Sequence, residues 1–154
     1  MVIAEIELAD ETATKALGAA LARVFRAGDV IRLEGGLGAG KSTLARAAIA
    51  SLAGERSAPS PTFTLVETYD ADHFTLWHFD LYRLEKPEDV YELGIEEALE
   101  GAVAMIEWPE RIEGMLPEDA LTARLEIAGS ARRAVFSGTA DWRARLAAAG
   151  IATQ

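Results

Sequence analysis

A glycine-rich run at residues 35–43 has the composition of a phosphate-binding loop. It reads Gly-Gly-Leu-Gly-Ala-Gly-Lys-Ser-Thr, and Gly35, Gly40, Lys41 and Ser42 match the pattern G-x-x-x-x-G-K-[ST]. Glycines let backbone N–H groups wrap around a phosphate at distances that a side chain would prevent. In such a loop the lysine reaches the β- and γ-phosphates and the hydroxyl binds Mg²⁺. The pattern predicts that the chain binds a nucleoside triphosphate.

Two acidic residues that end apolar segments are candidates for the metal site and for hydrolysis. Phosphoryl transfer depends on positioning and charge neutralisation, so a further carboxylate is expected near the metal. Glu107 follows the apolar run 102–106, and open α/β sheets place ligand-facing groups at the carboxyl ends of strands. We expect Glu107 to bind Mg²⁺, directly or through water, and Asp80 to hold the metal or orient the attacking water. The alternative for each is an ordinary solvated acid.

Three further side chains could act in the site or serve the fold alone. Thr62, in the polar loop 60–64, could place its hydroxyl on the γ-phosphate as ordered switch segments do in nucleotide hydrolases, or it could be a plain turn residue. His78 alternates with aromatic residues along a predicted strand, which favours a structural histidine over a base. Trp108 is flanked by apolar sequence, which favours packing over ligand contact.

The segments around the glycine-rich run predict the strand, loop and helix that such a motif requires. Residues Val30–Leu33 are short and rich in β-branched types, as expected of a strand. Residues Thr43–Leu52 are good helix formers and are followed by Gly54, which predicts a helix end. The N-terminus of that helix would add partial positive charge and free N–H groups to the phosphate site.

The rest of the chain predicts alternating strands and helices. Residues Asp10–Phe25 have the three- and four-residue apolar spacing of an amphipathic helix, with Asp10 as its cap. A short link at 70–73 joins two aromatic and β-branched segments, which predicts an antiparallel hairpin. The other expected elements are strands at Val2–Leu8, Phe63–Tyr69, Phe74–Asp80, Ala102–Ile106, Ala120–Ile127 and Ala134–Ser137, helices at Pro87–Gly101, broken near Gly94, and at Asp141–Ala149, and a polar loop from Glu107 to Pro117.

These elements indicate an α/β protein. We expect residues 1–154 to form a single P-loop ATPase domain with a three-layer, P-loop NTPase-like fold. Its central sheet should be mixed and mainly parallel, with one antiparallel hairpin.

Composition narrows the classes of function. The chain has no cysteine and only two histidines, which excludes disulfides, thiolate catalysis and cysteine-bound zinc. Its formal net charge of −10 argues against binding nucleic acid through a broad basic face, although the acidity could serve solubility alone. We expect a cytoplasmic protein with no membrane contact, because no apolar run approaches about 18 residues and residues 1–5 lack signal-peptide character.

Four motifs together indicate a family. The glycine-rich run is followed by Ser-Pro-Thr-Phe-Thr-Leu-Val-Glu at 60–67, His-Phe-Asp-Leu-Tyr-Arg at 78–83 and Ile-Glu-Trp-Pro-Glu at 106–110. Their order and spacing resemble the TsaE (YjeE) family from about Asp10 to Glu110. The glycine-rich run alone occurs in many families, whereas the four motifs together are specific.

The resemblance implies a bacterial cytosolic ATPase. In that family the ATPase is needed to form threonylcarbamoyladenosine at position 37 of tRNAs that read codons beginning with A. It works with TsaB and TsaD, and its hydrolysis of ATP is thought to reset the complex between turnovers. The net charge of this chain suits that arrangement, in which the partners hold the tRNA.

The resemblance also implies roles for individual residues. Ser42 and Glu107 would bind Mg²⁺, Lys41, Asp80 and Thr62 would serve hydrolysis, and Ser60–Glu67 would form a nucleotide-sensitive switch. The residues implied to contact ATP are Glu11, Gly38, Ala39, Gly40, Lys41, Ser42, Thr43 and Arg133, with Glu11 and Arg133 near the base. The chain has Gly36 where the family commonly has Asp, and Ser42 where it commonly has Thr. Serine keeps the hydroxyl that the metal needs.

Other functions are compatible with a phosphate-binding loop. A small-molecule kinase would share the loop and the size, but Glu55, Arg56 and the proline-rich segment after them supply neither an arginine-bearing lid nor an acceptor-binding acid. A nucleotide-switched binding module with negligible turnover is a further alternative. A GTPase is disfavoured because the chain has no Asn-Lys-x-Asp segment to read guanine.

Overall fold

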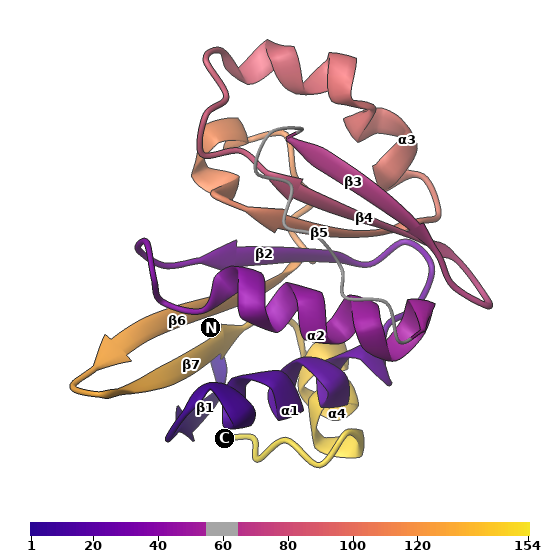
Figure 1. Ribbon diagram of the computed structural model, residues 1–154. Helices are drawn as coiled ribbons and strands as arrows, with labels where there is room; N and C mark the ends of the chain where they lie inside the picture. The colour runs from indigo at the N-terminus through magenta and orange to yellow at the C-terminus, as the bar shows by residue number, and fades with distance from the viewer. Residues whose placement is uncertain (55–64) are drawn as a thin grey trace.

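The computed structural model describes residues 1–54 and 65–154 as one sheet flanked by helices (Figure 1). The described strands form a seven-stranded sheet in the order β1-β7-β6-β2-β5-β4-β3. The elements are β1 (Val2–Leu8), α1 (Glu11–Ala22), β2 (Val30–Glu34), α2 (Lys41–Ala53), β3 (Val66–Asp70), β4 (Thr75–Asp80), the 3₁₀ helix η1 (Pro87–Leu93), α3 (Ile95–Leu99), β5 (Val103–Glu107), the 3₁₀ helix η2 (Pro109–Ile112), β6 (Leu121–Ala128), β7 (Ala131–Ser137) and α4 (Ala140–Ala148).

The predicted elements are present, with small shifts at their ends. The Asp10 side chain accepts a hydrogen bond from the N–H of Ala13 at 2.9 Å, which confirms the predicted cap of α1. The break near Gly94 is confirmed, because η1 ends there and α3 begins directly after it. The segment expected to be a loop after Glu107 contains η2, which begins at Pro109. Proline is well tolerated at the first position of a helix, because the N–H that it lacks would have no partner within the helix.

The sheet is parallel at its centre and antiparallel at both edges. β2 pairs in parallel with β5 and β6, and β4 pairs in parallel with β5. The β3–β4 pair is the predicted antiparallel hairpin, and β7 pairs antiparallel with β1 and β6. The carboxyl ends of β2, β4 and β5 therefore meet at one edge of the sheet, where the loop between β2 and α2 also lies (Figure 1).

Side chains alternate along the central strands and form two hydrophobic cores, one on each face. On β5, Val103 and Met105 belong to the core that includes residues of α1, α2 and α4. Ala104 and Ile106 belong to the core that includes residues of η1, α3 and η2. This arrangement confirms the expected three-layer α/β architecture. No helix within the described residues has both the length and the apolar character that a membrane crossing requires.

Close packing joins α1 to the helix that follows the phosphate-binding loop. Gly18 of α1 is buried, and a Cβ atom there would lie 2.5 Å from the carbonyl oxygen of Leu44 in α2. Only glycine permits this approach between the two helix backbones. The contact holds α2 against α1 and so positions the start of α2 relative to the sheet.

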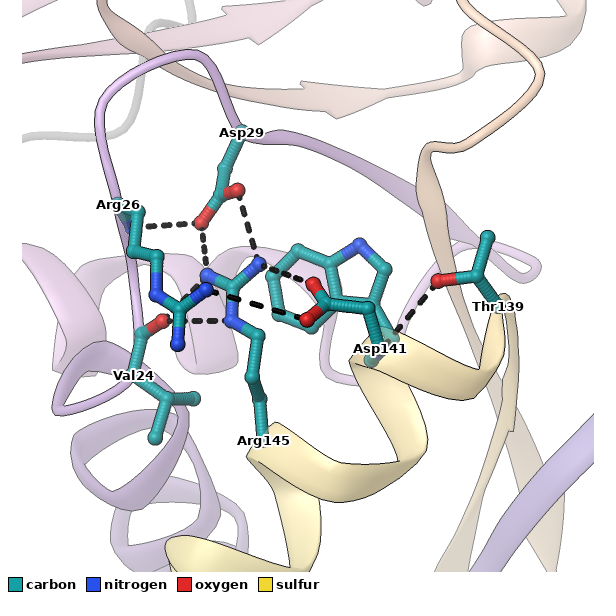
Figure 2. A network of polar contacts seen from close by, with 7 residues as sticks. Val24, Arg26, Asp29, Thr139, Asp141 and Arg145 are labelled. Atoms are coloured by element: carbon teal, nitrogen blue, oxygen red, sulfur yellow. Dashed lines mark hydrogen bonds and ion pairs between the residues drawn. The ribbon is translucent and has the colours of Figure 1, made fainter.

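A polar cluster attaches α4 to the turn before β2 (Figure 2). The guanidinium of Arg145 forms an ion pair with Asp29 and donates hydrogen bonds to the carbonyl of Val24. It also lies 3.8 Å from the ring centroid of Trp142. Arg145 and Asp29 are only 7% and 11% exposed at their side chains, so each compensates the buried charge of the other.

Candidate nucleotide site

The glycine-rich loop has a backbone that its glycines make possible. Gly35 and Gly40 have φ values of 137° and 108°, in the region that favours glycine. A Cβ atom on Gly35 would lie 2.4 Å from the carbonyl oxygen of Leu125 on β6. The loop leads directly into α2, whose first residue is Lys41, so the N–H groups of the first helical turn are free to face an anion.

The first hydroxyl of α2 contacts the predicted metal ligand at the end of β5. The Ser42 hydroxyl lies 2.9 Å from Oε1 and 3.0 Å from Oε2 of Glu107, to which it donates a hydrogen bond. Glu107 is 2% exposed and, two residues after Met105, faces α2 rather than α3.

The spacing of these two oxygens fits Mg²⁺. Neighbouring ligands of an octahedral Mg²⁺ at about 2.1 Å lie about 3.0 Å apart, close to the 2.9 Å and 3.0 Å between the Ser42 hydroxyl and the two carboxylate oxygens of Glu107. No group of three or more His, Cys, Asp or Glu side chains in residues 1–54 and 65–154 could hold a metal. Phosphate and water oxygens would therefore have to complete the shell, as they commonly do for Mg²⁺.

His78 supplies a second contact to Glu107. Its Nε2 lies 2.6 Å from Oε2 of Glu107, and both side chains are buried. A carboxylate that binds a metal only accepts hydrogen bonds, so a metal-binding role for Glu107 requires Nε2 of His78 to be the donor. The pair arises because β4 and β5 are parallel neighbours and residues 78 and 107 point to the same face.

Lys41 is held at the loop by two contacts. Its ammonium donates a hydrogen bond to the carbonyl of Gly35 and lies 3.7 Å from the ring centroid of Trp108. Burial lowers the pKa of Lys41, and nearby carboxylates, chiefly Glu107, partly oppose that effect. Trp108 has a φ of 60°, packs against the core that includes η1, α3 and η2, and has its ring centroid 4.9 Å from that of Tyr82, so the expected packing is confirmed, and the residue also lines the cavity beside Lys41.

Asp80 lies directly across from Glu107 in the register of β4 and β5. Burial raises its pKa, the negative charge of Glu107 raises it further, and a hydrogen bond from the N–H of Tyr82 at 3.2 Å partly opposes the shift. A carboxylate in this position accepts a proton more readily than an ordinary surface acid.

Two of the cavities that border the loop share Gly38, Gly40 and Thr43 among their lining residues. The first, the larger of these two, has a volume of about 390 Å³ and is lined by Lys41, Ser42, Asp80 and Glu107, the described residues predicted to serve the metal and hydrolysis. It is lined by Gly36, Leu37, Gly38, Ala39, Gly40, Lys41, Ser42, Thr43, Leu65, Asp80, Tyr82, Arg83, Glu107 and Trp108. The second, of about 230 Å³, is lined by Leu8, Asp10, Glu11, Thr14, Gly38, Gly40, Thr43, Ser130, Ala131 and Arg132. Glu11, which the resemblance places near the base, lines this second cavity together with residues of the loop; its contact with the base stays a prediction.

The arginine that the resemblance places near the base lies away from both cavities. Arg133 forms an ion pair with Glu126 on the neighbouring strand at 2.9 Å and does not line either cavity. Arg132 instead lines the second cavity and donates to the carbonyl of Gly38 at 3.1 Å. Successive side chains of a strand point to opposite faces, so a one-residue difference along β7 changes which arginine faces the loop.

One predicted site residue lies outside the described part of the chain. Thr62, and most of the predicted switch Ser60–Glu67, fall within residues 55–64, which the structure does not describe. The role expected of the Thr62 hydroxyl therefore stays a prediction.

Comparison with models of protein families shows which family this chain belongs to. The model named "Threonylcarbamoyl adenosine biosynthesis protein TsaE" matches residues 8–135. The chain belongs to the TsaE family. The match extends beyond Glu110, where the sequence motifs end, and includes β6 and the first five residues of β7.

Sequence and structure comparisons with individual proteins support this membership. The chain is similar to a Rickettsia conorii protein named "tRNA threonylcarbamoyladenosine biosynthesis protein TsaE", with 44% identity over 82% of this chain and 73% of that protein. It is 37% identical to the Bacillus subtilis protein of the same name over 79% of this chain and 77% of that one. Its fold is similar to the crystal structure of Bacillus subtilis YdiB, with a TM-score of 0.78, 28% identity and coverage of 96% and 94% of the two chains.

Proposed function

We propose that the chain is a Mg²⁺-dependent ATPase that serves the formation of the threonylcarbamoyl group on adenosine 37 of tRNAs reading codons that begin with A. The main support for this proposal is the contact between Ser42 and Glu107 at the start of α2. Their side-chain oxygens lie beside a phosphate-binding loop, at a separation that neighbouring ligands of one Mg²⁺ would have. Membership of the TsaE family supports the choice of pathway.

ATP would bind across the loop between the two cavities. The backbone N–H groups from Gly38 to Thr43 would cradle the phosphates. The Lys41 ammonium would leave the carbonyl of Gly35 and move to the β- and γ-phosphates. The base would occupy the smaller cavity, beside Glu11 and Arg132.

Hydrolysis would use the carboxyl end of β4. Asp80 lines the larger cavity and its raised pKa suits a group that orients the attacking water and takes up its proton. Mg²⁺, when bound, supplies neutralisation of the developing phosphate charge. Lys41 would neutralise more of that charge, and the Thr62 hydroxyl would contact the γ-phosphate.

The partners we propose are homologues of TsaB and TsaD, in the cytoplasm. The net charge of −10 is unfavourable for direct contact with tRNA, whose phosphates attract basic surfaces. We therefore place tRNA on the partner proteins, with this chain acting on the protein complex.

Phosphate release from ATP tests the proposal. It would be measured for the purified chain, alone and with a TsaB–TsaD pair bound to tRNA, beside Lys41→Ala and Glu107→Ala variants. We expect release that the complex stimulates and that both variants lose. Transfer of the phosphate to a metabolite, independent of the partners, would contradict the proposal and indicate a small-molecule kinase.

A further inference from the structure

We propose that His78 is a positioning residue of the metal site, which holds the Glu107 carboxylate in the orientation that Mg²⁺ requires. The inference rests on the proposed function, because it concerns the metal that would accompany ATP. It assigns a role to a histidine whose place in the sequence favours a purely structural residue.

The geometry around Glu107 supports this role. The Nε2–H of His78 donates to Oε2 at 2.6 Å, and the Ser42 hydroxyl lies 2.9 Å from Oε1. The carboxylate is thus held by one donor on its own sheet and by one on α2. Outer donors of this kind orient the carboxylates that bind metals.

Within the described part of the chain, the second ring nitrogen of His78, Nδ1, adds no hydrogen bond that would stabilise the fold. His78 is fully buried, and its Nδ1 has no hydrogen-bond partner among the described residues. A buried histidine placed for stability alone would be expected to satisfy both nitrogens. The neighbouring Leu76 and Phe79 of β4 are fully buried apolar residues, so an apolar residue could occupy this strand position without an unpaired nitrogen.

Binding of Mg²⁺ would make this contact more important. With Ser42 and Glu107 holding Mg²⁺, Glu107 directly or through water, the Ser42 hydroxyl would no longer be fixed on the carboxylate. His78 would then be the side chain that still donates to the carboxylate.

Two substitutions separate this role from simple packing. In His78→Gln the amide nitrogen lies about as far along the side chain as Nε2, so a donor to Glu107 is kept. In His78→Asn the amide reaches only the position of Nδ1, so that donor is lost. His73→Asn is the matched control, because His73 is exposed in the turn between β3 and β4 of the same hairpin.

The readout is the Kd of a non-hydrolysable ATP analogue, measured by calorimetry in Mg²⁺ and in EDTA. We expect His78→Asn to weaken binding about 10-fold in Mg²⁺ and to leave binding in EDTA unchanged, since loss of an outer donor costs about 10- to 100-fold in metal affinity. His78→Gln should restore most of the loss, and His73→Asn should match the wild type. Equal binding by His78→Asn and wild type in Mg²⁺, or an equal loss in EDTA, would overturn the role of His78. A wild-type chain that binds no analogue in Mg²⁺ would instead refute the proposed function.

Nitrogen-15 NMR of the histidine rings in the wild-type chain gives a test that does not depend on whether a variant folds. We expect a proton on Nε2 of His78. A spectrum with the proton on Nδ1 alone would overturn the inference, because Nε2 could not then donate to Glu107.

Discussion

Asp80 and Glu107 occupy matching positions on neighbouring strands, yet their surroundings suit different tasks. Glu107 is in contact with the Ser42 hydroxyl and with Nε2 of His78, so its carboxylate is held in one orientation from two sides. Asp80 accepts a hydrogen bond from the N–H of Tyr82 and has a raised pKa because it is partly buried beside another carboxylate. This difference supports the proposal that Glu107 holds the metal and Asp80 orients the attacking water.

Substitution of Asp80 tests that division of roles. We expect Asp80→Asn to bind Mg–ATP nearly as the wild type does, because the asparagine keeps the size of the side chain. Hydrolysis should fall by about 10² or more, since the amide cannot take up a proton. Single-turnover phosphate release and equilibrium binding measure the two effects separately. A folded variant that no longer binds ATP would show that Asp80 acts in binding rather than in hydrolysis.

The two neighbouring arginines of β7 provide a matched pair. Arg132 donates to the carbonyl of Gly38 in the loop, whereas Arg133 pairs with Glu126. We expect Arg132→Ala to raise the Kd for ATP about 10-fold, because a hydrogen bond from a charged donor contributes on the order of 1.5 kcal/mol. Arg133→Ala should leave the Kd unchanged.

Tripolyphosphate distinguishes how Arg132 acts. If the side chain contacts the base, Arg132→Ala should weaken binding of ATP and not of tripolyphosphate. If it acts by supporting the loop, both should weaken equally. A loss in Arg133→Ala that equals the loss in Arg132→Ala would contradict the placement of the two side chains.

At the residue scale, the sequence predicts the chemistry of side chains better than it predicts which way those side chains point. The types and spacing of Lys41, Ser42 and Glu107 are enough to predict a phosphate and metal site, and the structure brings these residues together. The position of Arg132, rather than Arg133, beside the loop was not predicted, because the resemblance gives no register for β7 and one residue reverses the face of a strand side chain. The pairing of His78 with Glu107 was missed because it joins two strands that are separate in sequence.

At the scale of elements, periodicity and turn residues predicted every helix and strand that positions the site. The loop lies between β2 and α2 because β-branched residues precede it and good helix formers follow it. The sequence does not predict that β7 lies between β1 and β6, since that order depends on packing between distant segments. The short 3₁₀ helix η2 was also missed, because four residues give too short a pattern to detect.

The cluster around α4 allows a stability prediction for an element (Figure 2). We expect Arg145→Met to lower the free energy of unfolding by about 3–5 kcal/mol, because it leaves Asp29 buried without its ion pair. Arg26→Met is the control, since Arg26 is 66% exposed at its side chain and lies 3.9 Å from Asp141. It should change stability by less than about 1 kcal/mol. Chemical denaturation measures both, and equal small losses would contradict a structural role for the buried pair.

At the scale of the whole molecule, the two ends of the chain support a site formed in the middle. β1 pairs with β7, and the N–H of Gln154 donates to the carbonyl of Ile3 at 2.8 Å. β7 in turn presents Arg132 to the loop, so residues near both ends border the smaller cavity. The family match to residues 8–135 includes β7 almost to its end.

The central claim is that Mg–ATP binds on the loop with the metal between Ser42 and Glu107. A crystal structure of the chain with Mg²⁺ and a non-hydrolysable ATP analogue tests it most directly. We predict the metal at about 2.1 Å from the Ser42 hydroxyl, with Glu107 in its shell directly or through one water. The phosphates should lie on the backbone N–H groups of Gly38–Thr43, with the base beside Glu11. A nucleotide bound elsewhere, or a metal that does not contact Ser42, would contradict the account.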